Sequence, residues 1–490
     1  MQAGRAVTVG LVAVLLTMRL LQKAMEFQFI GLAAMDSNAS RVEGGVSDSA
    51  SALSWMYTCR YLLPVLGGLL ACWIGHVRTL QLGGCVLLAS AGAMAGAVYT
   101  DQWRPDSGAT LTACALMLVY NGLVIPNVMY AVLSKRTRPQ RRTVLCALVY
   151  MSSAAGLFVG IQVQHLLTNP SVGKHCSLVW LAFALAFAAL AFLALPRLDA
   201  AAAMAPSSGQ LDTAPPPPFP KLLCNCGHVL LPTRSRLKRS CIVFGTLIPF
   251  LAGLCDDRSS AFNAQRALQP LIANSSGEDP RPSDLSGGAL LAVSLVAVNG
   301  GLVVAACCLR GRRRLPVQPR LLAGNVMEAA LELALAAVSG VGLADPVAVS
   351  AVYTASTVVD ATAAALTMVA AYELMDSFER DAAKPLIVGV MLTVWGLANL
   401  ASRCIVAICN RLPPDNPILQ PSSGKPPLLF VYHSLLLALL LLSLAFWRLF
   451  ALRLARSLQL VYEDEGPPEA AGYADDGEDR PLLPTAEQLG

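Results

Sequence analysis

Apolar residues come in blocks of about twenty along most of the chain, and short polar segments separate the blocks. Two of these blocks are Ser177–Leu195 and Leu428–Trp447. A helix of about twenty apolar residues is long enough to cross the hydrocarbon core of a bilayer. The pattern therefore predicts twelve transmembrane helices, at residues 6–34, 52–75, 79–99, 109–133, 143–165, 177–196, 240–268, 288–309, 320–342, 347–375, 385–409 and 427–449.

A longer polar segment separates the first six blocks from the last six. It contains four consecutive prolines, 215–218, which can neither continue a helix nor donate backbone hydrogen bonds, so we place the segment in water. We expect an all-α polytopic membrane protein built from two six-helix halves. Its predicted parts are an N-terminal half 1–196, a cytosolic linker 197–239, a C-terminal half 240–452 and an acidic, disordered cytosolic tail 453–490.

Composition narrows the function classes. The chain has 490 residues, of which 55% are hydrophobic and 14% charged, whereas an ordinary soluble domain has about 25% charged residues. This composition excludes a soluble enzyme, a nucleic-acid-binding protein and a disordered chain.

The motifs G-x-S-x-G and H-E-x-x-H and the phosphate-binding P-loop are absent from the sequence, so we expect no enzymatic activity and no cofactor. Cys224, Cys226 and His228 resemble half of a zinc site without its second half, and we expect no bound metal.

The distribution of basic residues orients the chain. Segments 134–143 and 310–320 each hold five Lys or Arg residues, whereas 100–109 and 166–176 each hold one. Short cytoplasmic loops collect Lys and Arg, so the two basic segments and both termini are predicted to face the cytosol. The glycosylation triplets at Asn38 and Asn274 then fall in loops on the opposite side. The first apolar block could instead be a cleaved signal peptide, but its apolar pattern continues to residue 34 without a clear cleavage site.

Charged residues inside the predicted spans carry most of the functional information, because each costs about 2.5–3.5 kcal/mol at a helix centre. Arg19, Lys23 and Glu26 are spaced by four and three residues and so share one face of the first helix. They are predicted to line a polar path, or alternatively to form a self-neutralising stripe that packs the bundle. Arg60 in the second span is predicted to snorkel to the outer interface.

Two carboxylates are candidates for proton exchange. Asp256 lies in the outer third of the seventh span, unless that helix ends near Leu254 and leaves Asp256 in a loop. Glu373 follows a long apolar run in the tenth span. A carboxylate in such a position exchanges protons or binds a cationic group.

Several stretches match recurring sequence motifs. Leu63–Ala71 is similar to the start of L-P-x-x-G-G-x-L-A-D, with Cys72 in place of the aspartate, and Leu254–Gln265 is similar to L-F-D-Q-Q-G-S-x-W-x-x-Q. Ala371–Ser377 resembles G-L-E-F-x-Y-S, and Gly396–Asn399 resembles A-L-G-N. By these motifs the chain resembles the proton-coupled oligopeptide transporter family of the major facilitator superfamily. The matches occur in the family's order along the chain. They imply the major facilitator fold and a transporter.

The chain departs from this family where protons and peptide termini are bound. The glutamates of the first-helix pattern E-x-x-E-R fall on Gln22 and Met25, its arginine falls on Glu26, and the fourth-helix lysine falls on Ile125. The resemblance implies that Asp256 and Glu373 keep the family's roles. As a separate hypothesis, Arg19 and Lys23 supply the missing positive charge from a shifted position.

We therefore expect a secondary transporter of small solutes, such as short peptides or amino acids, with possible proton coupling; the alternative is a transporter-like sensor or membrane scaffold. The expected partners are the lipid bilayer, a small-molecule substrate and protons. The predicted pathway residues are Arg19, Lys23, Glu26, Tyr57, Asn127, Tyr150, Asp256, Phe262, Gln265, Asn299, Glu373 and Asn399.

The C-terminal tail carries an acidic dileucine pattern, formed by Glu478, Leu482 and Leu483. Cytosolic sorting adaptors read such signals. This motif favours an endosomal or lysosomal membrane over the plasma membrane.

Overall fold

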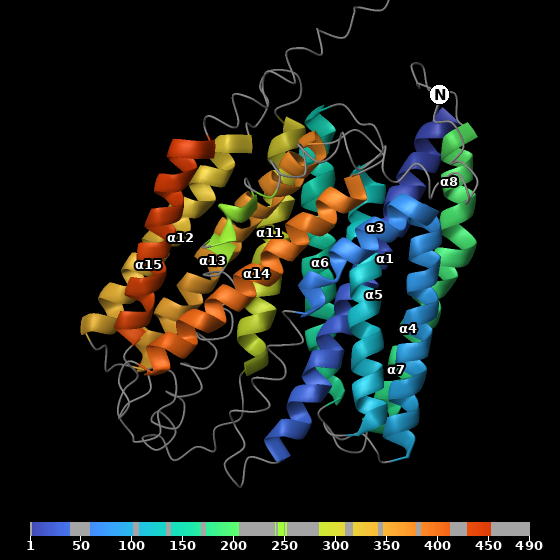
Figure 1. Ribbon diagram of the computed structural model, residues 1–490, viewed down its shortest axis with the longest axis horizontal. Coiled ribbons are helices and arrows are strands. Elements are labelled where there is room, and N and C mark those ends of the chain that lie inside the picture. Colours follow the sequence, from blue (N-terminus) through green and yellow to red (C-terminus); the bar gives the residue numbers. More distant parts are fainter. Residues whose placement is uncertain are drawn as a thin grey trace, which may run out of the picture. The chain divides into compact units, whose positions relative to one another are not determined.

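Helices occupy almost all of the described chain (Figure 1). The computed structural model describes residues 2–39, 59–100, 107–133, 139–167, 173–204, 241, 244–248, 250–251, 284–308, 317–341, 346–378, 384–411 and 429–451. The helices are α1 (Gln2–Ala39), α3 (Pro64–Ile74), α4 (His76–Tyr99), α5 (Gly108–Leu133), α6 (Pro139–Leu167), α7 (Gly173–Ala189), α8 (Leu195–Met204), α11 (Asp284–Cys308), α12 (Val317–Val341), α13 (Pro346–Phe378), α14 (Lys384–Arg411) and α15 (Leu429–Phe446). Single π-helical turns, Leu190–Ala194 and Trp447–Ala451, join α7 to α8 and extend α15.

These helices confirm the predicted class, an all-helical polytopic membrane protein. Among the described residues, nine helices are long and apolar enough to cross a membrane, and Cys59–Ile74 and Pro385–Ala401 are shorter apolar helices. The seventh predicted span, 240–268, lies mostly outside the described residues. Two helices run past their predicted ends, α1 to Ala39 and α8 to Met204, so Asn38 lies in the last turn of α1 rather than in a loop.

The packing of the helices reflects an internal duplication. Residues 1–445 form one compact unit, and a second unit, 446–490, is described only at 446–451. Within the first unit, α4 packs on α5 and α7, α1 packs on α6, and α11 and α12 pack on α13. Among the described helices, four pairs join the early helices to the late ones, namely α3 with α14, α6 with α11, α6 with α13 and α5 with α14. In the predicted order of spans, the pair α3 with α14 is span 2 with span 11, and the pair α6 with α11 is span 5 with span 8. Exchanging the two sets of six spans converts the first of these two pairs into the second, as expected for parallel repeats.

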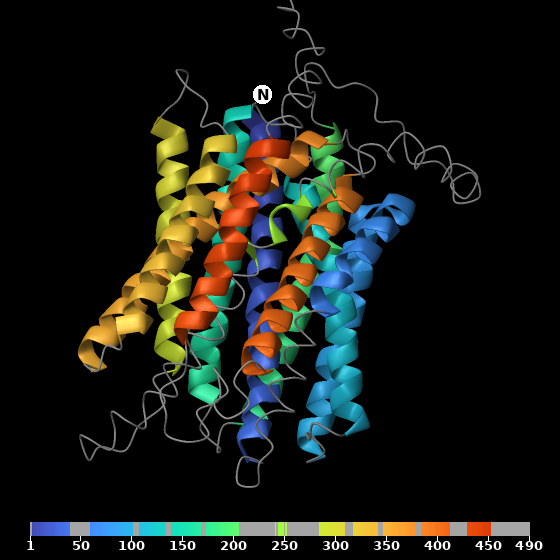
Figure 2. The same cartoon turned by 60° about the vertical axis from the view of Figure 1, so that its left-hand side comes forward.

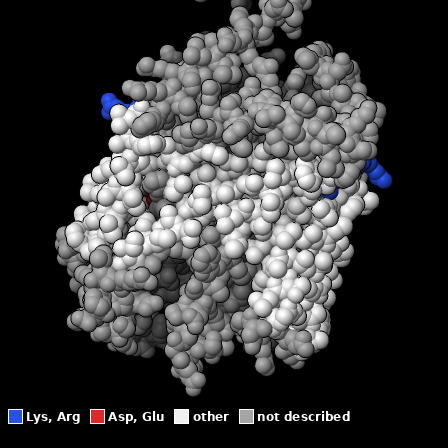
Figure 3. Space-filling view, in the orientation of Figure 1, with Lys and Arg blue, Asp and Glu red and all other residues white. Residues whose placement is uncertain are grey.

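The described part of the face in Figure 3 carries few charged side chains. Lys and Arg appear near its upper left and right margins, and a small acidic patch lies in a recess toward the left. Figure 2 shows α14 and α15 side by side, where Tyr432 and Leu436 of α15 pack against Ile405 of α14. An apolar belt with charges at its margins is what a bilayer's hydrocarbon core selects.

Helices α3 and α14 touch backbone to backbone. Each carries a proline four residues before a glycine, Pro64 with Gly68 and Pro385 with Gly389. A Cβ atom on Gly68 would lie 2.4 Å from the Pro385 carbonyl oxygen, and one on Gly389 would lie 2.6 Å from the Pro64 carbonyl oxygen. The contact is therefore reciprocal, and only glycine fits it. It lies at the end of the bundle where α5 and α11 end and α6 and α12 begin, which we call the basic end because segments 134–143 and 310–320 adjoin it.

A neighbouring face of α3 makes a second close backbone contact, with α5. Pro126 has no N–H to donate to the Gly122 carbonyl one turn earlier. A Cβ atom on Gly67 would lie 2.0 Å from that carbonyl oxygen, so the glycine lets α3 close over it. Asn127 Nδ2 donates to the carbonyl oxygens of Gly67 at 3.2 Å and Leu123 at 2.6 Å, which ties the two helices together.

We expect Gly68→Ala and Gly389→Ala to destabilise the protein by about 1–3 kcal/mol each, because the added methyl group meets a backbone carbonyl. Gly300→Ala is the matched control, since no atom lies within 4 Å of its Cβ position and it is also inside a helix. Thermal unfolding of the purified variants in detergent measures the effect. Equal midpoints for the three variants would contradict the close contact.

Candidate functional site

A buried hydrogen-bonded cluster joins three helices of the first set. Arg19 of α1 donates from Nε to Oγ of Ser153 on α6 at 2.7 Å, and from Nη1 to Oε1 of Gln22. Gln22 Nε2 in turn donates to Oδ1 of Asn121 on α5 at 2.5 Å. All four residues, which we call the Arg19 cluster, are buried. Polar groups in an apolar interior need such partners, so the cluster fixes how α1, α5 and α6 meet.

A glycine on α6 brings the helix backbones close enough for these bonds. A Cβ atom on Gly156 would lie 2.4 Å from the carbonyl oxygen of Leu20 and 2.9 Å from Cβ of Lys23. Lys23 is thereby placed against α6 and is half-buried. The predicted polar face of α1 is thus present at Arg19, Gln22 and Lys23, whereas the side chain of Glu26 lies outside the described residues.

An aromatic pair connects this cluster to the second set of helices. Tyr150 of α6 and Tyr372 of α13 are in edge-to-face contact, with ring centroids 6.2 Å apart, and both are buried. The Tyr372 hydroxyl interacts electrostatically with Arg19 and with Tyr61. A cation, hydroxyl groups and ring edges from both sets of helices therefore converge at one place.

A second aromatic pair lies beside α3 and α14. Tyr61 stacks on Trp395 of α14, with ring centroids 5.5 Å apart and planes 8° from parallel. The Arg60 guanidinium carbon lies 4.5 Å from the centroid of the Tyr61 ring, an attractive cation–π geometry. The prediction that Arg60 snorkels to the interface is wrong, because Arg60 is only 3% exposed.

A buried ion pair lies next to Tyr372. Glu373 accepts two hydrogen bonds from Arg320 of α12, Nη1 to Oε1 at 2.8 Å and Nη2 to Oε2 at 2.7 Å. Both side chains are less than 10% exposed. The parallel two-bond geometry is the strongest form of an arginine–carboxylate contact. Sequence reasoning counted Arg320 with the basic loop, but it is a buried residue in the first turn of α12.

Sequence reasoning missed a second group of ionisable residues on the late helices. Glu328 and Glu332 of α12 and Asp360 of α13 are buried. Nδ1 of His433 on α15 lies 2.8 Å from Oε2 of Glu332. All four lie inside predicted spans, so the rule that singled out Glu373 also applied to them. No group of His, Cys, Asp or Glu with the geometry of a metal site occurs in the described part of the chain.

Two predicted pathway asparagines are used mainly for helix structure. Asn127 bonds backbone carbonyls of α3 and α5, and Asn299 Nδ2 donates to the Leu295 carbonyl oxygen of its own helix at 2.7 Å. Both side chains are fully buried, and within the described residues each Oδ1 lacks a hydrogen-bond partner.

The remaining predicted residues are placed only in part. Asn399 is half-buried on α14, one turn beyond Trp395. The other predicted pathway, glycosylation and sorting positions lie outside the residues whose side chains are described, namely Glu26, Asn38, Tyr57, Asp256, Phe262, Gln265, Asn274, Glu478, Leu482 and Leu483.

Comparison with known proteins identifies the fold. No family model and no curated protein sequence matches the chain. It is similar to the crystal structure of the human organic anion transporter MFSD10, with a TM-score of 0.57, 14% identity and coverage of 89% of this chain and 99% of that one. It is also similar to a bacterial homologue of the iron transporter ferroportin in an outward-facing state, with a TM-score of 0.60, 13% identity and coverage of 89% and 98%. The chain thus has the major facilitator superfamily fold, as predicted. The resemblance to the oligopeptide transporter family remains a prediction.

We expect Arg320→Gln and Glu373→Gln each to lower the free energy of unfolding by about 3–5 kcal/mol, because each leaves one buried group of the pair without its counter-charge. The exchange Arg320→Glu with Glu373→Arg should recover part of the loss. Arg78→Gln, at an exposed position of α4, is the control and should change stability by less than about 0.5 kcal/mol. The double variant Arg320→Gln with Glu373→Gln should lose less than the sum of the two single losses, and thermal unfolding in detergent measures the stability of all of these variants. A double-variant loss equal to that sum would contradict a direct pair.

Proposed function

We propose that the protein is a secondary active transporter of small solutes that carry a carboxylate group, such as amino acids or short peptides. The observation that carries this proposal is the Arg19 guanidinium. It is buried at the junction of α1, α5 and α6 and interacts with Tyr372 of the opposite set of helices. A guanidinium offers a planar set of donors that matches a carboxylate.

The chemistry of the residues, rather than the fold, supports this substrate class. The two similar structures are described as an organic anion transporter and a homologue of an iron transporter, so the fold accommodates different cargoes. In this chain the central cation is accompanied by the hydroxyl group of Tyr372, and the bundle also holds the unpaired Oδ1 acceptors of Asn127 and Asn299 on other helices. A zwitterionic solute has an anionic group for Arg19 and donors for these acceptors.

The contacts between the two sets of helices suit a rocking motion. At the basic end, α3 and α14 meet through glycine and proline backbones rather than through interlocked side chains. Close helix approaches of this kind allow Cα–H···O contacts, which are worth about 0.5–1 kcal/mol each, so the two helices can separate at modest cost. Opening there would expose the Arg19 cluster to the side that the positive-inside rule assigns to the cytosol.

We place proton coupling at Glu373. Its carboxylate is held by Arg320 and it follows Tyr372 directly in α13. Protonation would remove the negative charge, release Arg320 and let the last turns of α13 shift Tyr372 against Arg19. The ion pair and the substrate site would then be coupled through a single helix.

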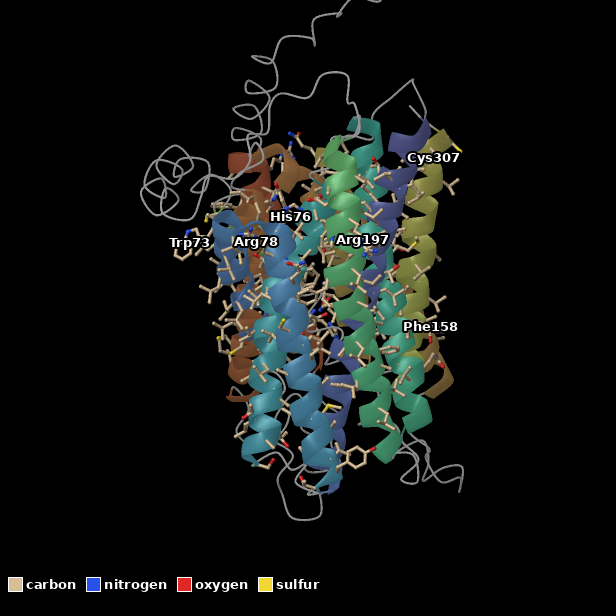
Figure 4. The ribbon with its side chains drawn as sticks, turned by 90° about the vertical axis from the view of Figure 1, so that its right-hand side faces the viewer. Trp73, His76, Arg78, Phe158, Arg197 and Cys307 are labelled. Atoms are coloured by element: carbon tan, nitrogen blue, oxygen red, sulfur yellow. The ribbon has the colours of Figure 1, made fainter. Side chains whose placement is uncertain are left out.

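We expect Arg19→Gln to reduce uptake by proteoliposomes at least tenfold, because a central carboxylate partner is lost. The assay uses mixtures of labelled amino acids and di- and tripeptides. Arg197→Gln, at an exposed position of α8 (Figure 4), should retain wild-type uptake. Uptake that survives Arg19→Gln would contradict the substrate site. The absence of uptake by folded wild-type protein would instead favour the sensor or scaffold alternative.

We expect Glu373→Gln to abolish accumulation driven by a pH gradient while exchange of labelled for unlabelled substrate at equal pH continues. Glu373→Asp, which keeps the titrating group, should retain the gradient dependence. Both variants are compared with wild type as monodisperse protein reconstituted in the same orientation. Unchanged gradient dependence in Glu373→Gln would contradict this proton site, although the substrate site at Arg19 would stand.

A further inference from the structure

Helix α11 ends in two adjacent cysteines, Cys307 and Cys308. Both thiols are free and both residues are exposed. Figure 4 shows Cys307 at the end of α11, with its side chain directed away from the neighbouring helices. Neither residue belongs to the Arg19 cluster, to the ion pair or to the close contact between α3 and α14.

The cysteines lie at the depth of a membrane boundary. The apolar part of α11, Leu290–Cys308, has 19 residues. At 1.5 Å per residue this is about 28 Å, close to the thickness of the hydrocarbon core. Trp73 and Arg78, exposed residues near the junction of α3 and α4, mark the same end of the bundle (Figure 4). Tryptophan and arginine are typical of the headgroup level.

One face of α11 is exposed, and this face extends from the two cysteines toward the N-terminus of the helix. Exposed residues recur along one face of the helix, namely Val293, Ala297, Gly301, Val304 and Cys308. Gly300 and Gly301 lie seven residues, or two turns, before Cys307 and Cys308, and no atom lies within 4 Å of either Cβ position. Side chains of a helix lean toward its N-terminus. In α11 this direction leads from the basic end into the membrane, so each thiol leans toward the empty surface at the glycines.

We propose that Cys307 and Cys308 are S-acylated with long-chain fatty acids and that the acyl chains lie along this face of α11. The donor is a fatty acyl-coenzyme A. The cysteine thiolate attacks the thioester carbonyl carbon, a new carbon–sulfur bond forms, and the bond to coenzyme A breaks. Coenzyme A leaves and takes up the proton that the cysteine lost, so the exchange involves no net oxidation or reduction. Juxtamembrane cysteines are the usual sites of this modification.

The sequence after α11 favours the same reaction. Arg310, Arg312, Arg313 and Arg314 follow the cysteines. A basic run at the membrane surface attracts anionic headgroups and the phosphate groups of an acyl-coenzyme A. The positive-inside rule assigns this end to the cytosol, where acyl-coenzyme A is formed.

The test uses the full-length protein expressed in eukaryotic cells. Hydroxylamine cleaves the thioesters, and a polymer tag on each released thiol then reports the number of acylated cysteines as steps in gel mobility. We expect two steps for wild type, one for Cys307→Ser or Cys308→Ser, and none for the double variant. Cys85→Ser and Cys404→Ser, which remove other exposed cysteines, should leave both steps.

Metabolic labelling with an alkyne fatty acid and mass spectrometry of the α11 peptide checks the result without a substitution. No hydroxylamine-dependent step in wild type would overturn the proposal. Steps that persist in the double variant would overturn it as well, because they would assign the modification to other cysteines.

Discussion

Burial of ionisable groups among apolar helices is the constraint on which the rest of this structure depends. An isolated charge in this environment is costly, so each must be held by partners from other helices. Arg19 is held by Ser153 and Gln22, and Glu373 by Arg320. Each arrangement joins different helices, so the polar groups specify which helices meet and at what height. The apolar residues make the helices soluble in the bilayer, but they contribute little to the choice of which helices pack together.

Much of the fold follows from the sequence because a bilayer imposes one length on every span. The hydropathy blocks predict most helices, with ends shifted by a few residues where helices such as α1 continue beyond the apolar part. Pairing between helices is harder to predict, since it depends on a few small residues. Gly68 and Gly389 are separated by more than 300 residues, and neither hydropathy nor charge relates them. Only their positions against Pro385 and Pro64 reveal their shared role.

The candidate site could be predicted only in part, for reasons that differ between residues. Arg19 and Glu373 stand out because a charge inside an apolar run is visible in the sequence. Arg320 lies at the boundary of a span, where a loop charge and a buried charge look alike until the partner is known. The prediction for Arg60 was wrong because a long side chain near a predicted interface usually reaches water. Here the Arg60 guanidinium lies over the ring of Tyr61 instead. Glu332 and His433 lie 101 positions apart and are recognised as a pair only once α12 and α15 are brought together.

A contact between the two sets of helices and a contact within one set have different mechanical consequences. The backbone contact between α3 and α14 has no directional side-chain bonds, so it can open and close repeatedly without leaving buried charges unpaired. The Arg320–Glu373 pair joins α12 to α13 within one set and would have to lose a charge before it separates. A fold with this division would move readily between its sets of helices and resist change within them. Tyr372 is influenced electrostatically by Arg19 and Tyr61 and directly precedes Glu373 in α13. In the proposed mechanism, α13 is therefore the element through which a change at the ion pair would reach the centre of the bundle.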